Sequence, residues 1–281
     1  MDLLLTALEQ ALVLLPLVLG MYISFHILNV TDLTVDGTYV LGAALFGSYI
    51  HFGVVPAMML TILGGACVGF VVSMMQRNNI VDSLVVGILA SFMLYSINLQ
   101  CMGRPNISVL GMPTIMSQMN QESWIVPLGI LGLLLIIVLT ILLRSRLGLL
   151  LRSFGQNQKL LNILGKNSES YRLLGLVISN ALAAFSGSLA AQVNGFADII
   201  MGFGVALVSI GAIVVGKHIL IKRHKNFNSL KEIVACCIGI FLYFICLSGL
   251  LRIGINPVNL KLALGLVLYV SLRKIHRGLQ L

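Results

Sequence analysis

Leu128–Leu143 reads LGILGLLLIIVLTILL and decides the class of fold. Thirteen of its residues are Leu, Ile or Val, each worth roughly −0.3 to −0.6 kcal/mol in the middle of a membrane helix. Their sum of about −6 kcal/mol outweighs the two Gly residues and the one Thr. The stretch therefore predicts a helix that crosses a lipid bilayer.

The rest of the chain has the same character, since 58% of its residues are hydrophobic, only 10% are charged and the mean hydropathy is +1.03. Runs near 20 residues cross a ~30 Å hydrocarbon core as helices, whereas the short alternating segments of a barrel are absent. We predict an all-α integral membrane protein with nine transmembrane helices, or eight, in a single polytopic domain over residues 1–281. The apolar runs are Leu3–Leu28, Gly37–Gly53, Val54–Met75, Ile80–Cys101, Leu128–Leu143, Tyr171–Gln192, Gly202–Leu220, Ile233–Leu251 and Pro257–Leu272.

The basic residues predict how the chain is oriented, because Lys and Arg are enriched in cytoplasmic loops. Placing the polar segment Arg144–Arg172 inside puts fifteen of the 18 Lys and Arg residues on that side, together with the C-terminus. The net charge of +9 is then explained by this asymmetry. Anionic lipid headgroups of the bilayer, and not nucleic acid, are the partners that it indicates.

Two polar segments interrupt the apolar pattern, and the first is Asn29–Thr38 (NVTDLTVDGT). A carboxylate at the bilayer centre costs roughly 2.5–3.5 kcal/mol, so Asp32 and Asp36 predict an interfacial loop or a broken helix that faces protein or water. In one interpretation, Asp32 or Thr31, and then Asp36, are helix N-caps and Gly37 permits an unusual turn. In the other, the break lines a solute path, and one segment can do both.

The second interruption, Gln192–Asp198, precedes a glycine-rich stretch at Met201–Val205. The predicted topology places the two breaks on opposite faces of the membrane, as a broken-helix core with an inverted repeat would. An ordinary outer loop is the alternative interpretation of the second break. We expect the following residues to line or shape a path: Asp32, Thr34, Asp36, Gly37, Thr38, Asn194 and Gly195.

The segment Arg144–Arg172 is basic and polar, and it lies between two long apolar runs, as a docking element for a partner protein does. The pattern predicts a short helix over Gln156–Leu164 that has one apolar face and ends at a glycine. An amphipathic helix that lies on the lipid headgroups is the alternative. The residues of this predicted contact are Gln156, Lys159, Leu160, Ile163, Leu164 and Gly165.

No sequence pattern indicates a metal site or a bound cofactor. The five Cys and five His residues are scattered without ligand spacing. Gly211–Lys217 resembles a phosphate-binding loop, but His218 stands where magnesium binding needs Ser or Thr, and the four intervening residues are apolar. We therefore expect no catalytic residue, no metal and no nucleotide on this chain.

The motifs DLTVDG (Asp32–Gly37) and GFADIIMGFG (Gly195–Gly204), within a similarity from about Ser24 to Gly216, carry a family resemblance. The chain resembles permease subunits of bacterial ABC importers in the branched-chain amino acid and ribose permease superfamily. It is most similar to a subgroup associated with tryptophan-type or unassigned substrates.

The resemblance implies a homodimer of permeases in the bacterial plasma (inner) membrane, two cytoplasmic ATPase subunits that use ATP, and an extracytoplasmic solute-binding protein. It implies that Ser153–Gly165 is the coupling helix that docks on the ATPase and that the solute is an amino acid. The chain itself would be a transport subunit and not an enzyme. The alternative is a self-contained ion-coupled transporter, which would need an ionisable residue deep in a helix, whereas Asp82 and Glu232 lie at predicted helix ends.

Overall fold

The computed structural model describes residues 2–77, 80–114, 124–220 and 229–252, with Gly254 and Gly265. Its helices and strands are α1 (Asp2–Met21), the π-helix η1 (Tyr22–Ile27), α2 (Thr34–Tyr49), the 3₁₀ helix η2 (Ile50–Phe52), α3 (Val54–Met75), α4 (Ser83–Met102), β1 (Asn106–Ser108), α5 (Ile125–Arg144), α6 (Arg146–Gln156), α7 (Gln158–Ile163), α8 (Ser168–Asn194), β2 (Phe196–Asp198), α9 (Val205–Leu220) and α10 (Ser229–Arg252).

Six of these helical segments are long and apolar enough to cross a membrane: Leu4–Ile27, Val54–Met75, Ser83–Met102, Ile125–Arg144, Ser168–Asn194 and Ser229–Arg252. The predicted all-α membrane class is therefore confirmed. Two other predicted runs form helices of only 16 residues, α2 and α9. At ~1.5 Å per residue each is about 24 Å long, too short for a ~30 Å hydrocarbon core. The ninth predicted run, Pro257–Leu272, lies outside the described residues.

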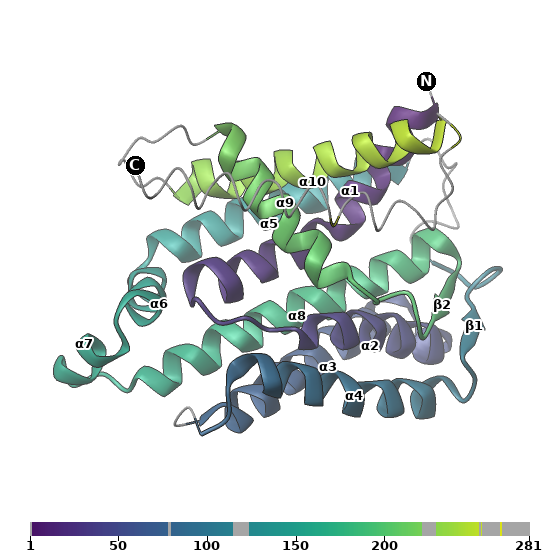
Figure 1. Cartoon of the computed structure of the whole chain (residues 1–281). Coiled ribbons are helices and arrows are strands. Elements are labelled where there is room, and N and C mark those ends of the chain that lie inside the picture. The colour runs from purple at the N-terminus through teal and green to yellow at the C-terminus, as the bar shows by residue number, and fades with distance from the viewer. Residues whose placement is uncertain are drawn as a thin grey trace.

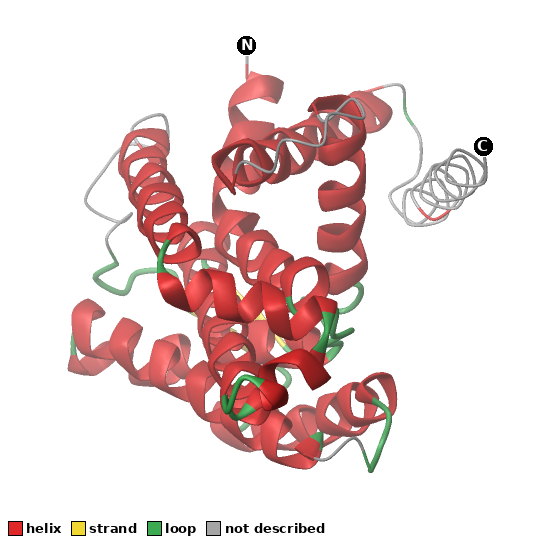
Figure 2. Ribbon diagram, turned by 90° about the vertical axis from the view of Figure 1, so that its left-hand side faces the viewer, coloured by secondary structure: helices red, strands yellow, loops and turns green. Residues whose placement is uncertain are grey.

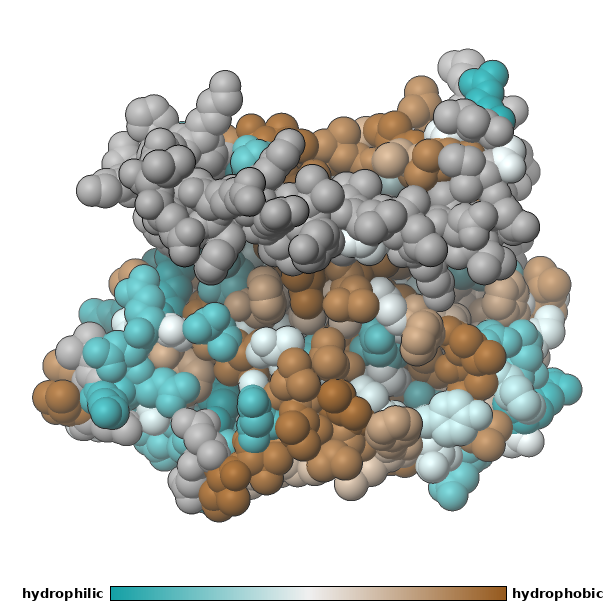
Figure 3. Space-filling view, viewed as in Figure 1, coloured by the Kyte–Doolittle hydropathy of each residue, from teal (hydrophilic) through white to brown (hydrophobic). Residues whose placement is uncertain are grey.

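The helices form an elongated bundle with two distinct ends (Figure 1). The α6–α7 end carries the two short helices of the polar segment Arg144–Arg172, called the basic segment from here on. The strand end carries β1 and β2, which pair antiparallel with Ile107 opposite Ala197. Figure 2 looks from the α6–α7 end and shows the strands behind the helices. In Figure 3 hydrophilic residues gather toward both ends and apolar residues lie between them, as expected of a membrane-embedded surface.

The centre of the bundle is formed by α1 and α8. In each of these helices 67% of the most apolar 18-residue stretch is buried, against 22–28% of the same stretch in α3, α4, α5 and α10. The outer helices expose large apolar side chains, such as Phe92, Ile130 and Leu133. Lipid tails solvate such side chains, so the hydrophobic surface needs no protein cover.

Glycine contacts let α8 approach α2 so closely that their backbones meet. A Cβ atom on Gly187 would lie 1.9 Å from the carbonyl oxygen of Tyr39, and one on Gly42 would lie 1.9 Å from that of Ala184. Small residues at helix interfaces allow this backbone contact, which drives packing where lipid removes the hydrophobic driving force. The small-residue seam thus fixes the position of the short helix α2.

Candidate functional site

The first break begins where η1 ends at Ile27, at the α6–α7 end of the bundle. Asn29 has a φ of 54°, and the chain then runs back toward the interior, where α2 begins at Thr34 (Figure 1). Backbone hydrogen bonds from Leu28 N to Ile23 O (2.9 Å) and from Val30 N to Ser24 O (3.0 Å) hold the reversal. The predicted broken helix is therefore present, with its second half starting inside the protein.

Asp32 organises the start of α2. Its carboxylate accepts hydrogen bonds from the backbone N–H of Thr34 (3.0 Å), from the Thr34 hydroxyl and from Nδ2 of Asn180 on α8 (2.8 Å). The Thr38 hydroxyl donates to Oδ1 of Asn180 (2.7 Å). All four side chains are fully buried. The predicted capping role of Asp32 is confirmed, although Leu33 holds the N-cap position itself.

The second break follows α8 at the strand end. Gly195, with a φ of 75°, terminates α8, and its N–H donates to Ala191 O (3.1 Å). The chain then forms β2, turns through residues 199–204 and begins α9 at Val205, away from the strands (Figure 1). This break enters the bundle from the end opposite to the first.

Asp36 joins the two breaks. Its Oδ1 accepts from the backbone N–H of Ala206 (2.7 Å), and its Oδ2 accepts from that of Gly204 (3.1 Å). The prediction that Asp36 caps its own helix was wrong, because α2 already begins at Thr34 and Asp36 in its first turn faces the N-terminus of α9. The N-terminal ends of two half-helices therefore meet inside the bundle, with a carboxylate from one on the free N–H groups of the other.

The interpretation of Gly37 as a turn residue was also wrong, since it lies within α2. Its missing side chain instead lets α4 approach, because a Cβ atom there would lie 2.9 Å from Leu94. The Gly37 carbonyl accepts from Nδ2 of Asn98 on α4 (3.0 Å).

The structure thus brings together five of the seven predicted path residues, Asp32, Thr34, Asp36, Gly37 and Thr38. The other two, Asn194 and Gly195, lie at the strand end, where Asn194 Oδ1 accepts from Gln10 (3.4 Å).

Sequence reasoning missed Asn180 and Asn98, which bind the first break from α8 and α4. A signal was available for Asn180, which is an amide in the middle of the apolar run Tyr171–Gln192, whereas Asn98 lies near the end of its run beside Gln100.

The two halves of the core run in opposite directions. In the first, α1 and η1 lead to the α6–α7 end, the break returns inward, and α2 runs out to the strand end. In the second, α8 leads to the strand end, the break returns inward, and α9 runs out to the α6–α7 end. The same order of a long helix, a break and a 16-residue half-helix occurs twice with inverted direction, as the sequence predicted.

The basic segment forms two helices where one was predicted. Asn157 is extended, with a φ of −158°, so α6 ends at Gln156 and α7 begins at Gln158. The predicted stop at Gly165 is confirmed by its φ of 69° and by the bond from Lys166 N to Leu161 O (2.9 Å).

The α7 region presents part of the predicted apolar face. Ile163 and Leu164 are 81% and 63% exposed, while Leu161, which was not predicted, is fully buried. Gln156 and Lys159 are exposed, as expected. The Leu160 side chain lies outside the described part of the structure.

The basic segment packs directly on the start of the first break. A Cβ atom on Gly155 of α6 would lie 2.0 Å from the carbonyl oxygen of Ile27, so the two backbones touch. Beside this contact is a hollow of about 370 Å³, and it is lined by Leu28, Asn29, Phe154, Gly155, Gln156, Asn157, Gln158 and Lys159. α6 and the start of the break are therefore in direct backbone contact, so that α6 could push on Ile27.

The family described as "Branched-chain amino acid transport system / permease component" matches residues 3–272. The chain belongs to this permease family. It is a multi-pass membrane permease of a transport system, and it is not an enzyme. The permease is 59% identical over 277 residues to an uncharacterized protein of Rickettsia prowazekii (strain Madrid E), covering 99% of both chains.

The permease is also 34% identical over 269 residues to the tyrosine transport system permease protein of Clostridioides difficile (strain R20291), covering 95% of this chain and 89% of the relative. Among solved structures, it is similar to a chain of PsaBC from Streptococcus pneumoniae in complex with Fab, with 16% identity, a TM-score of 0.39 and coverage of 85% and 89% of the two chains. That structural likeness is too low to support an argument about the fold.

Proposed function

We propose that this permease is the transmembrane subunit of an ATP-driven importer and moves an amino acid by alternating access. Residues 1–281 form its single membrane domain, and residues 144–172 form the segment that couples it to the ATPase. Two copies of the permease pair in the bacterial plasma membrane with two cytoplasmic ATPase subunits, which bind the ATP. An extracytoplasmic solute-binding protein delivers the solute, and the C-terminus lies in the cytoplasm.

The contact between Gly155 and Ile27 carries this proposal. The basic segment offers exposed apolar side chains at Ile163 and Leu164 for a partner, and its other part rests on the backbone at the start of a broken helix. A partner that pulls on α7 therefore displaces the break without any chemistry in the permease. The Lys and Arg residues around the segment fit the cytoplasmic side.

The matching family, described as a branched-chain amino acid transport system permease component, favours an amino acid as the solute. The relative from Clostridioides difficile, a tyrosine transport system permease protein, makes tyrosine the first solute to test.

The solute path is proposed to pass the junction where the N-termini of α2 and α9 meet. The residues that shape it there are Asp32, Thr34, Asp36, Gly37 and Thr38. The two remaining residues, Asn194 and Gly195, shape its entrance at the strand end.

The decisive experiment is an affinity purification of the tagged permease from gently solubilised native membranes after crosslinking, with the partners identified by mass spectrometry. Recovery of an ATPase is the expected result. A binding protein recovered with it is then screened for thermal stabilisation by amino acids, beginning with tyrosine. Recovery of the permease alone contradicts the proposal, and uptake that collapses with a proton or sodium gradient would favour the ion-coupled alternative.

A paired substitution tests the coupling surface. We expect Ile163→Asp with Leu164→Asp, and likewise Leu160→Asp with Leu164→Asp, to remove the ATPase from the purified complex and to abolish uptake. Membrane insertion should be unchanged, because the segment lies outside the spanning helices. The matched control is Leu110→Asp, which changes a leucine that is 78% exposed at the strand end and should leave ATPase recovery intact.

A further inference from the structure

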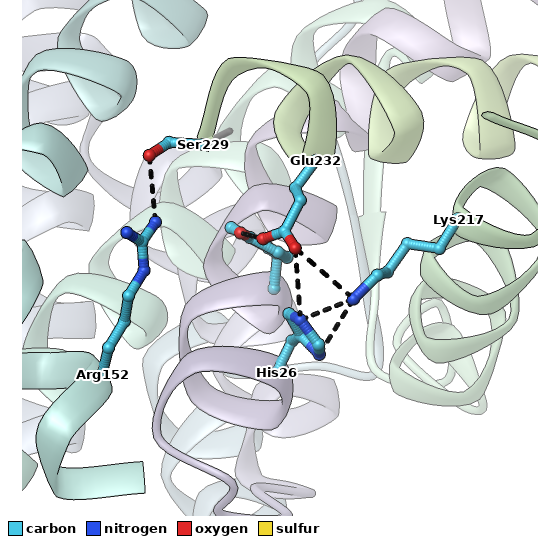
Figure 4. Close-up of polar contacts among 6 residues, drawn as sticks. His26, Arg152, Lys217, Ser229 and Glu232 are labelled. Atoms are coloured by element: carbon cyan, nitrogen blue, oxygen red, sulfur yellow. Dashed lines mark hydrogen bonds and ion pairs between the residues drawn. The ribbon is translucent and has the colours of Figure 1, made fainter. Parts of the chain in front are cut away.

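A polar cluster of four side chains, Tyr22, His26, Lys217 and Glu232, lies at the cytoplasmic ends of three helices, where no role has been assigned to it. Tyr22 Oη donates a hydrogen bond to Glu232, while His26 Nε2 and Lys217 Nζ lie 3.9 Å and 3.8 Å from Glu232 Oε1. Lys217 Nζ also lies 2.6 Å from His26 Nε2. Figure 4 shows Glu232, Lys217 and His26 converging from three separate helices.

Within this cluster, the Glu232 cluster from here on, the carboxylate and the Tyr22 ring are withdrawn from solvent, whereas the two basic side chains reach the surface. Tyr22 is fully buried and the Glu232 side chain is 11% exposed, against 35% for His26 and 25% for Lys217. A buried carboxylate needs both charge and hydrogen-bond partners, and here it takes them from η1 and α9 while it belongs to α10. Removing Glu232 would therefore remove the polar contact that η1, α9 and α10 share, and replacing it by Gln would leave Lys217 facing a neutral group.

The π-helical geometry of η1 accounts for part of this convergence. Tyr22 and His26 both belong to η1, their rings stack with centroids 5.4 Å apart, and both reach Glu232. A π-helix is a widened turn that commonly marks a functional site. In the same helix Ile27 carries the backbone contact with Gly155 of the basic segment.

The Glu232 cluster is connected to both half-helices, α2 and α9. From η1 the chain continues directly through the first break into α2. From Lys217 the link runs along α9, over about 17 Å, to Ala206, whose N–H binds Asp36. The basic segment also contacts α10 near this point, since Arg152 on α6 donates to Ser229 at the start of α10 (3.1 Å, Figure 4).

We propose that Glu232 is a positioning residue for energy coupling. It fastens η1, α9 and α10 to one another, so that a displacement of the basic segment moves both half-helices at the same time. Without this connection, the displacement reaches α9 only through Asp36 and through the glycine contacts between α9 and α10. ATP hydrolysis then continues while the solute path opens less often. This inference rests on the proposed function.

The test uses the complete transporter, with its ATPase subunits and binding protein, in proteoliposomes loaded with ATP. Solute uptake and ATP hydrolysis are measured in the same vesicles for the unaltered permease and for Glu232→Gln. We expect uptake to fall at least about tenfold while hydrolysis falls less than about twofold. The number of ATP molecules used per solute therefore rises at least about fivefold.

Asp82→Asn is the matched control, because Asp82 lies outside the basic segment and caps its own helix, α4, by accepting from Leu84 N (3.3 Å). Its ATP-to-solute ratio should equal that of the unaltered permease. Tyr22→Phe removes one hydrogen bond from the Glu232 cluster and keeps the ring, so it should raise the ratio by a smaller factor. Glu232→Asp keeps the charge and should restore part of the uptake.

A purely structural role predicts a different result. Uptake and hydrolysis would then both fall in proportion to the amount of assembled transporter. An unchanged ATP-to-solute ratio in Glu232→Gln and Tyr22→Phe overturns this inference and leaves the proposed function standing. If Glu232→Gln does not assemble, Tyr22→Phe decides by the same criterion. If the unaltered permease takes up solute without ATP hydrolysis, the proposed function fails and the inference falls with it.

Discussion

We predict that Asp36 holds the two halves of the core together, because its carboxylate binds the N-terminus of α9, a helix from the other half of the chain. It accepts from Ala206 N at 2.7 Å and from Gly204 N at 3.1 Å, and Ala206 is fully buried. An unpaired buried donor costs roughly 1–3 kcal/mol. With the Gly204 N–H less buried, we expect Asp36→Ala to lower the free energy of unfolding by about 2–4 kcal/mol.

Asp36→Asn keeps one acceptor oxygen but loses the negative charge at the helix N-terminus, so we expect about half of that loss. The assay is unfolding in mixed detergent micelles containing increasing SDS, followed by circular dichroism. Hydrogen exchange of the Ala206 and Gly204 amides gives a local measurement. A loss of 2–4 kcal/mol corresponds to exchange about 30- to 700-fold faster, if the site opens locally.

The matched control for Asp36 is Asp82, which caps α4 by accepting from Leu84 N (3.3 Å) at an exposed helix end. Water can replace Asp82 but cannot replace Asp36, so Asp82→Ala should cost less than Asp36→Ala. If the two variants lose equal stability, and the Ala206 amide exchanges no faster in Asp36→Ala, the argument that Asp36 holds α9 is refuted.

Three further predictions concern the first break and its packing. Gly187→Val should prevent folding or assembly, because its Cβ atom would lie 1.9 Å from the Tyr39 carbonyl oxygen, and size-exclusion chromatography would then show no monodisperse peak. Asn180→Leu should lower the free energy of unfolding by about 2–4 kcal/mol, as it leaves Asp32 and a buried threonine without their amide partner; a loss under about 1 kcal/mol in SDS titration would contradict this. Asn29→Gly should be nearly neutral in the same titration, whereas Asn29→Val should cost about 1–2 kcal/mol because its φ is 54°; equal stability of these two variants would show that the left-handed conformation is not required.

Much of the fold was predictable because a lipid environment leaves the backbone few options. Apolar runs such as Leu128–Leu143 had to become helices, and two carboxylates in Asn29–Thr38 had to mark a break. The capping role of Asp32 followed from its position just before a helix. The inverted order of the halves was indicated by the predicted topology, which placed the two breaks on opposite faces of the membrane.

The details that failed depend on tertiary contacts that no local pattern encodes. Asp36 was assigned to its own helix because a carboxylate at a helix start is usually a local cap. Its actual partner, the N-terminus of α9, lies about 170 residues away in the chain. Gly37 was interpreted as a turn because nothing in the sequence announces that α4 packs against it. The split of the basic segment at Asn157 was missed for the same reason, since α6 is fixed by its contact with Ile27.

The contact between Asp36 and α9 also bears on why transport would need an external energy source. Asp198, the last residue of β2, directly precedes the turn before α9, but its carboxylate already accepts from Ile200 N (2.8 Å) and from Nδ2 of Asn106 (3.0 Å). The N-terminus of α9 therefore takes its carboxylate from the other half of the core. A movement that separates α9 from α2 would break two hydrogen bonds to a charged group, at about 1.5–3 kcal/mol each. A gap of about 3–6 kcal/mol leaves the separated state below about 1% of the population. Thermal motion alone would then open the junction rarely, and in the proposed function a force applied through Gly155 and Ile27 would open it.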